Sequence, residues 1–170
     1  PRGPEHGDEL TLAGLVVGRV LLCEGRRRGQ GEAEKDLEVV QGAIGERDRR
    51  VRLAAILAIR PLGPGGLKSL LRHLPQEPDA NNRKMAIKTL QHWDDPEAVP
   101  TLVRLLRTEL DRGVRNFAVT ALESITERKY GDDPDAWAEY VETRELHRQA
   151  KELLSEDLLE KARKITEAPR

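Results

Sequence analysis

The feature of this 170-residue chain that most constrains its fold is a pattern that occurs three times. Each copy has an aspartate, an arginine four residues later, an alanine after three more residues and a large aliphatic residue after another four. The copies are Asp48, Arg52, Ala55, Ile59; then Asp79, Arg83, Ala86, Leu90; then Asp111, Arg115, Ala118, Leu122. They are offset by 31 and 32 residues, a period typical of stacked helix pairs that bury their apolar faces only against their neighbours.

Each copy predicts a first helix, because the apolar spacing is helical and aspartate caps the free amides of a helix start. A second helix follows, since Leu67, Leu70 and Leu74 recur 32 residues later as Val99, Leu102 and Leu106. The turn between the helices is Asp95-Pro96-Glu97 in the second copy and Asp133-Pro134-Asp135 in the third. Both turns combine an N-cap with proline at the first helical position. In the first copy the glycines and prolines of 61–66 end the helix without offering a side-chain cap.

The two ends of the chain are less regular. Leu37, Val40 and Ile44 repeat the second-helix spacing, so we expect residues 1–47 to form a degenerate N-terminal unit, with a first helix over 9–23 and a flexible Gly/Arg loop over 24–33. Residues 48–142 would hold the three repeats. Residues 143–170 would form capping helices, one ending near Leu154 and the next starting with Ser155 as its N-cap.

Composition agrees with an all-α chain and reduces the number of function classes that the chain can belong to. Hydrophobic residues make up 38% and charged residues 35%, with five aromatic residues, which does not suit a β-sandwich. The formal net charge of -1 gives no overall attraction to nucleic acid or to anionic membranes. A single cysteine, Cys23, and four scattered histidines do not predict a disulfide, a metal site or a cofactor. The apolar run 10–23 is too short to span a membrane and contains Arg19.

The repeats resemble bacterial HEAT repeats, including the short subgroup found in phycobilisome lyase-like proteins. The resemblance covers residues 37–142 and is strongest at Asp94-Asp95-Pro96-Glu97-Ala98-Val99-Pro100, which is similar to the family's inter-helix turn. It implies an α-solenoid of antiparallel HEAT-like helix pairs. It also implies that the aspartates and arginines of the first helices form a structural ladder between repeats. Those residues are Asp48, Arg52, Asp79, Arg83, Asp111 and Arg115.

The sequence favours a protein that is not an enzyme, because the common nucleophile, phosphate-loop and zinc-protease motifs are absent. Trp93-Asp94-Asp95 resembles the combination of Trp and Asp in HEAT-like DNA glycosylases. However, Asp95 is already expected to be the N-cap before Pro96. A lyase or glycosylase built on this scaffold is therefore the third alternative.

We expect a scaffold or protein-interaction module that presents a concave helical surface to a protein partner or to another domain of its parent chain. If the second helices line that surface, their polar positions form a candidate binding stripe. The stripe consists of Lys68, Arg72, Thr101, Arg104 and Arg107, with Ser69 beside them. A nucleic-acid-binding solenoid is the alternative function. The other interpretation of the stripe is a solvated face without a binding role. No membrane contact is expected. The first residue is Pro1, so we expect a truncated or processed N-terminus, and cytoplasm is the default expectation for location.

Overall fold

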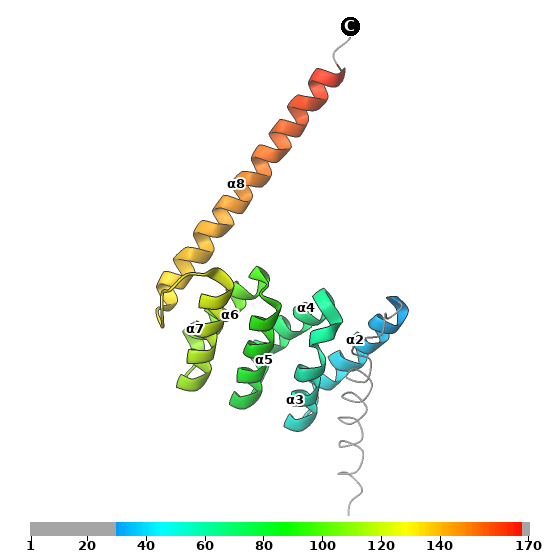
Figure 1. Cartoon of the computed structure of the whole chain (residues 1–170), viewed down its shortest axis with the longest axis vertical. Helices are drawn as coiled ribbons and strands as arrows, with labels where there is room; N and C mark the ends of the chain where they lie inside the picture. Colours follow the sequence, from blue (N-terminus) through cyan, green and yellow to red (C-terminus); the bar gives the residue numbers. More distant parts are fainter. Residues whose placement is uncertain (1–29, 168–170) are drawn as a thin grey trace, which may run out of the picture. The chain divides into compact units, whose positions relative to one another are not determined.

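The computed structural model describes residues 30–167, and this part of the chain is built from α-helices without strands (Figure 1). Three short 3-10 turns, η1 (Arg60–Leu62), η2 (Leu74–Gln76) and η3 (Pro96–Ala98), connect some of the helices. The all-α prediction is therefore confirmed. The helices are α2 (Gln30–Ile44), α3 (Arg49–Ala58), α4 (Gly63–His73), α5 (Ala80–Trp93), α6 (Val99–Thr108), α7 (Arg112–Thr126) and α8 (Pro134–Glu167).

The first helix of each repeat starts at the predicted aspartate. The carboxylate of Asp48 accepts a hydrogen bond from the backbone N–H of Arg50 at 2.6 Å, at the start of α3. Asp79 caps α5 in the same way, and Asp111 accepts from the N–H of Val114 at 2.8 Å to cap α7. These bonds satisfy amides that have no partner inside the helix, so the repeat register read from the sequence is the register of the fold.

Neighbouring first helices pack on one another, α3 on α5 and α5 on α7. Ala55, Ala86 and Ala118 are fully buried at equivalent positions of α3, α5 and α7, as their recurrence predicts. A methyl side chain at a buried helix position lets neighbouring backbones approach closely. The large aliphatic side chains that complete this row, Ile59, Leu90 and Leu122, are also fully buried.

The second helices bury the predicted leucine and valine positions. Leu70 and Leu74 of α4 and η2 and Leu102 and Leu106 of α6 are fully buried. Upstream, α2 contributes Val40 and Ile44 to the same core and packs on α3 and α4, so it takes the place of a second helix in a preceding unit.

The turn of the first repeat depends on glycine. Residues 60–66 carry no side-chain cap, as predicted, and Gly63 adopts the left-handed backbone conformation at φ 61°. A Cβ atom on Gly66 would lie 2.6 Å from the carbonyl oxygen of Ile59. The chain can turn back from α3 to α4 at this point because Gly66 has no side chain.

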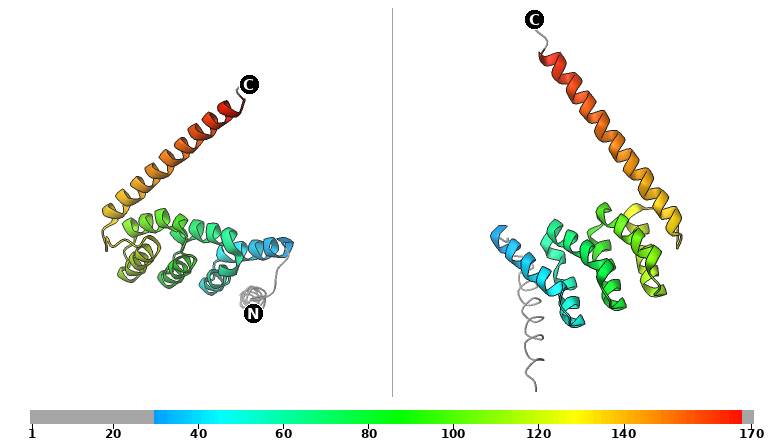
Figure 2. Two further views of the ribbon diagram at one scale, coloured as in Figure 1. Left: turned by 45° about the horizontal axis from the view of Figure 1, so that its top comes forward. Right: turned by 180° about the vertical axis from the view of Figure 1, so that it is seen from behind.

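The repeats form two rows of helices. The left view of Figure 2 shows α3, α5 and α7 side by side in a lower row, and α2, α4 and α6 in a second row above it. In the first row α5 packs on both α3 and α7, and in the second row α2 packs on α4. That the second helices line a concave surface stays a prediction.

The N-terminal end of the described chain differs from the sequence expectation in one respect. The helix α2 begins at Gln30, so residues 30–33 belong to a helix and not to a flexible loop. Residues 24–29 of that loop, the expected helix over 9–23 and Cys23 lie outside the described residues.

The described chain divides into two units, with the boundary between Asp132 and Asp133. The second unit contains α8, which is continuous from Pro134 to Glu167, so the expected break at Ser155 is wrong. Asp133 caps its start by accepting from the N–H groups of Asp135 and Ala136, at 3.0 and 3.1 Å. Among the described helices, none has the length and apolar character that crossing a membrane requires.

Candidate interaction surfaces

The arginine of each first helix connects the segment before that helix to the segment after the repeat. The guanidinium of Arg52 donates to the backbone carbonyls of Glu46 and Arg47, at 2.9 and 2.8 Å. It also binds both carboxylate oxygens of Glu77, with Nη2 to Oε1 at 2.9 Å and Nε to Oε2 at 2.9 Å. Both side chains are buried, so this bidentate pair lies in a desolvated position.

The second and third repeats reproduce this arrangement. Arg83 donates to the carbonyls of Glu77 and Pro78 at 3.1 Å and binds the Glu109 carboxylate, with Nε to Oε2 at 2.6 Å. Arg115 donates to the carbonyl of Leu106 and pairs with Asp132. The arginines are therefore structural residues that tie successive connections together.

The pairing differs from the ladder that the family resemblance implies. The arginines bind Glu77, Glu109 and Asp132, whereas the capping aspartates bind basic residues of the preceding first helix. Asp79 lies 3.5 Å from Nη1 of Arg49, and Asp111 lies 3.3 Å from Nζ of Lys84.

Sequence reasoning missed the two glutamates of this network. A signal for them exists, because a glutamate precedes the capping aspartate by two residues in every repeat. The three pairs are Glu46 and Asp48, Glu77 and Asp79, and Glu109 and Asp111. In the second and third pairs the glutamate also accepts a hydrogen bond from the aspartate's own N–H, at 3.0 and 2.9 Å.

These contacts shift the ionisation of the acids. Burial of Glu77 opposes its ionisation, but hydrogen bonds from Arg52, the N–H of Asp79 and His73 outweigh burial and hold the pKa of the carboxyl below its ordinary value of 4.5. The N–H of Asn82 and the guanidinium of Arg49 lower the pKa of Asp79.

Acid is therefore expected to destabilise the repeats. A carboxyl with a lowered pKa in the folded state contributes stability in full above its ordinary pKa, near 3.8 for Asp and 4.5 for Glu, and loses it as the pH falls through the folded value. The urea midpoint should stay level down to about pH 5 and then fall steadily toward pH 3. Equal urea midpoints at pH 5 and pH 3 would show that these contacts do not favour the ionised acids.

The candidate binding stripe lies on the second helices. Lys68 and Arg72 of α4 and Arg104 and Arg107 of α6 are exposed. Thr101 is buried, 5% exposed, and its hydroxyl accepts a hydrogen bond from Nη2 of Arg104 at 3.3 Å. The accessible stripe therefore has four cationic side chains, and we call Lys68, Arg72, Arg104 and Arg107 the basic stripe.

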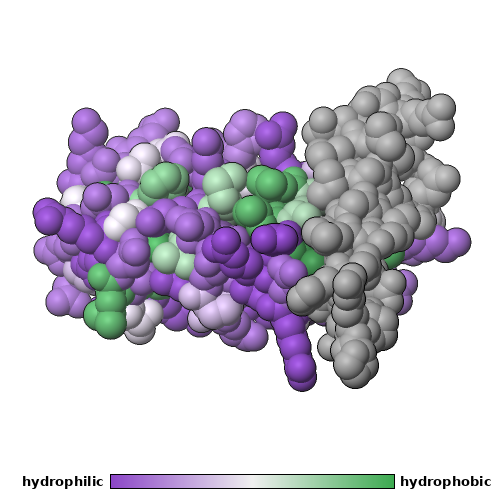
Figure 3. Space-filling view, turned by 90° about the horizontal axis from the view of Figure 1, so that it is seen from below, coloured by the Kyte–Doolittle hydropathy of each residue, from purple (hydrophilic) through white to green (hydrophobic). Residues whose placement is uncertain are grey.

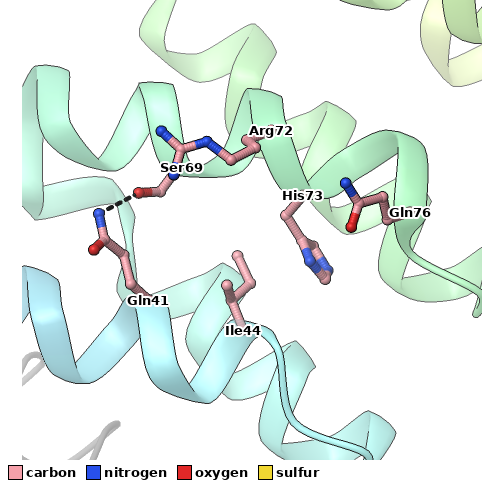
Figure 4. Close-up of a pocket in the computed structure, with 6 residues that line it drawn as sticks. All are labelled: Gln41, Ile44, Ser69, Arg72, His73 and Gln76. Carbon is pink, nitrogen blue, oxygen red and sulfur yellow. Dashed lines mark hydrogen bonds between the residues drawn. The ribbon is translucent and has the colours of Figure 1, made fainter.

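A small hollow borders the basic stripe between α2 and α4. The close-up in Figure 4 shows Arg72 and His73 beside it, with a hydrogen bond of 2.7 Å from Nε2 of Gln41 to Oγ of Ser69. His73 Nε2 lies 2.8 Å from the Glu77 carboxylate. Ser69, His73 and Glu77 lie four residues apart and have the residue types of a serine–histidine–acid catalytic triad. However, the hydroxyl of Ser69 accepts a hydrogen bond from Gln41, and the charge of Glu77 is neutralised by Arg52. The contacts are those of a structural network.

The aspartates of the Trp93-Asp94-Asp95 motif also have structural roles. Asp94 ends α5 in a left-handed conformation, and Asp95 accepts from the N–H of Glu97 at 2.8 Å, so its predicted capping role is confirmed. Within residues 30–167, no group of three or more His, Cys, Asp or Glu side chains is arranged to hold a metal ion.

Comparison with known proteins identifies the repeats. Residues 67–138, from α4 into α8, match the family model of HEAT repeats. A search of the curated proteins and a search of the solved structures gave no match. The family match is to HEAT repeats in general and does not confirm the phycobilisome lyase-like subgroup. With first helices that start at equivalent capping aspartates, this chain contains HEAT repeats over residues 67–138.

Proposed function

We propose that this chain is a non-enzymatic scaffold that binds an acidic segment of a protein partner, or of another domain of its parent chain, through the basic stripe. HEAT repeats generally serve as scaffolds for protein interactions, and the family is typically non-enzymatic. The observation that carries the proposal is the repetition of Arg72 at the equivalent position of the next second helix, as Arg104, with both side chains exposed.

Two features of the basic stripe support a carboxylate ligand. Within the described residues, Lys68 and Arg72 have no ion pair, so their charge is not neutralised by the fold. Guanidinium groups that repeat along successive helices can each bind one carboxylate with two parallel hydrogen bonds. The capping role of residues 143–170 stays a prediction.

The test is affinity capture with the wild-type chain and with the double variant Arg72→Glu, Arg104→Glu, read by mass spectrometry after nuclease treatment. We expect proteins that the wild type retains and the double variant loses, because like charges would then face the acidic segment. The matched control is Arg112→Glu with Arg128→Glu, which makes the same charge change at exposed positions of α7 and the connection after it. Identical capture by wild type and double variant would contradict the proposal.

The alternative is a nucleic-acid-binding solenoid, which the basic stripe would also suit. A binder of this kind neutralises several phosphates, so its affinity falls steeply with salt. We expect no gel shift with duplex or single strands at physiological salt, since the net charge of the whole chain is -1. A sub-micromolar complex that salt weakens strongly, and that Arg72→Ala with Arg104→Ala also weakens, would reverse the ranking.

A further inference from the structure

A second surface lies on the row of first helices, away from the basic stripe. A groove of about 250 Å³ runs between α3 and α5, with Leu57 on one side and Met85 on the other. Leu57 is 45% exposed, whereas its neighbours Ile56 and Ala58 in α3 are fully buried. The groove is smaller than the roughly 300–1,000 Å³ of sites for drug-sized molecules, so it suits a single side chain better than a whole small ligand.

The rim of the groove is basic. Arg60, Lys88 and His92 line it and are exposed, and no carboxylate lines it. Within the described residues, none of these three has an ion pair. The remaining polar group, the hydroxyl of Thr89, donates to the carbonyl of Met85 at 2.9 Å and is already satisfied. A ligand that brings carboxylates to this rim would therefore meet positive charge that the protein leaves uncompensated.

The apolar position of the groove recurs along the row. Met85 of α5 corresponds to Phe117 of α7 in the repeat register, and Phe117 is 41% exposed. Figure 3, which views the molecule from below, shows small apolar patches in a largely hydrophilic surface. A partner on this row would therefore make a mixed contact, with isolated apolar anchors between charged groups, and not a broad hydrophobic interface.

We propose that the α3–α5 groove binds a segment of a partner protein that inserts one large apolar side chain between Leu57 and Met85 and places flanking carboxylates against Arg60 and Lys88. The inference rests on the proposed function in that the chain binds proteins, but it concerns a different face. The apolar walls favour a protein ligand over nucleic acid, whose phosphates would use the basic rim alone.

The experiment is fluorescence polarisation with the full chain and a labelled 15-residue peptide that has one leucine flanked by glutamates. Three further probes accompany it: the peptide with serine for leucine, the peptide with lysines for glutamates, and a labelled DNA duplex. We expect saturable binding of the first peptide and at least tenfold weaker binding of the other three. Absence of binding by the leucine–glutamate peptide, equal binding of the serine peptide, or tighter binding of the duplex would overturn the proposal.

Variants then place the peptide in the groove. Leu57→Ser with Met85→Ser removes the apolar walls, and Lys88→Glu reverses one rim charge at an exposed position that the fold does not need. Both should weaken peptide binding at least tenfold. The controls are Leu110→Ser, at a leucine that is 96% exposed outside the groove, and Arg128→Glu, at an exposed arginine after α7 that lies outside the groove and the basic stripe, and both should change binding less than twofold.

The outcomes separate this inference from the proposed function. Loss of peptide binding with Lys68→Glu, and not with Lys88→Glu, would overturn the groove while leaving the basic stripe in place. Conversely, partner capture can prove independent of Arg72 and Arg104 while peptide binding still depends on the groove residues. That result would overturn the proposed function and leave the groove in place. Thermal melts of each variant show whether the fold is retained, and Lys88→Glu carries the test if the double serine variant does not fold.

Discussion

Replacement of Ala86 by glutamate is expected to unfold the repeats or to lower their free energy of unfolding by about 4 kcal/mol or more. Ala86 is fully buried in α5, the middle helix of the row, which packs on α3 on one side and on α7 on the other. A glutamate at this position would place a carboxylate without a partner in the apolar core of the repeats. Since small domains have only about 5–15 kcal/mol of stability in total, this single substitution removes a large part of it.

The measurement is a urea titration followed by far-UV circular dichroism. Ala150→Glu is the matched control, because Ala150 is exposed in α8 and the same change there adds a charge to a solvated helix surface. The control should leave the transition of the repeats in place. If Ala86→Glu had the same urea midpoint as the wild type, the repeat register that aligns Ala55, Ala86 and Ala118 would be wrong.

Glu77→Ala has the second largest expected effect, a loss of about 3–5 kcal/mol. The Glu77 side chain has no exposed surface, and it accepts hydrogen bonds from Arg52, from the N–H of Asp79 and from His73. Its removal would leave the Arg52 guanidinium, which is 8% exposed, buried without its counter-charge. Breaking one side of a buried pair costs more than the pair itself contributes, because the remaining charge stays desolvated.

The reason for the loss can be checked with a second substitution. Arg52→Ala combined with Glu77→Ala should be less destabilising than the sum of the single changes, because neither partner is then left unpaired. Glu152→Ala is the control, since Glu152 pairs with Arg148 at an exposed site where ion pairs contribute little. Equal urea midpoints for Glu77→Ala and Glu152→Ala would show that the buried pair does not stabilise the connection between repeats.

The sequence predicts the helices of this fold well because each local signal agrees with the packing. The aspartate caps, the alanine contacts and the apolar spacing of α4 and α6 all repeat at one period, and each is a property of a single helix or turn. The predicted break at Ser155 depends on a capping residue followed by two acidic residues, Glu156 and Asp157. Between Asp135 and Glu167 there is no glycine or proline to end a helix, so α8 continues through that position.

The candidate surfaces are predicted less completely, because they depend on how elements pack. Thr101 was placed in the stripe, but it lies three residues after Ala98 and four before Leu105 on the buried side of α6. The sequence alone does not distinguish Glu77 and Glu109 from solvated charges, since their burial arises only when the connections fold over the arginines. The α3–α5 groove joins residues from different repeats, so no local pattern in the sequence announces it.

The most direct test of the account is a titration of the captured partner with the wild-type chain and with Arg72→Glu, Arg104→Glu, each paired with a thermal melt. Exposed charges contribute less than about 1 kcal/mol to folding, so the melting temperature should change little. The Kd should rise at least tenfold, because the substituted carboxylates repel the acidic segment. An unchanged Kd would show that the basic stripe is only a solvated face, and loss of the cooperative melt would show that these arginines hold the fold together.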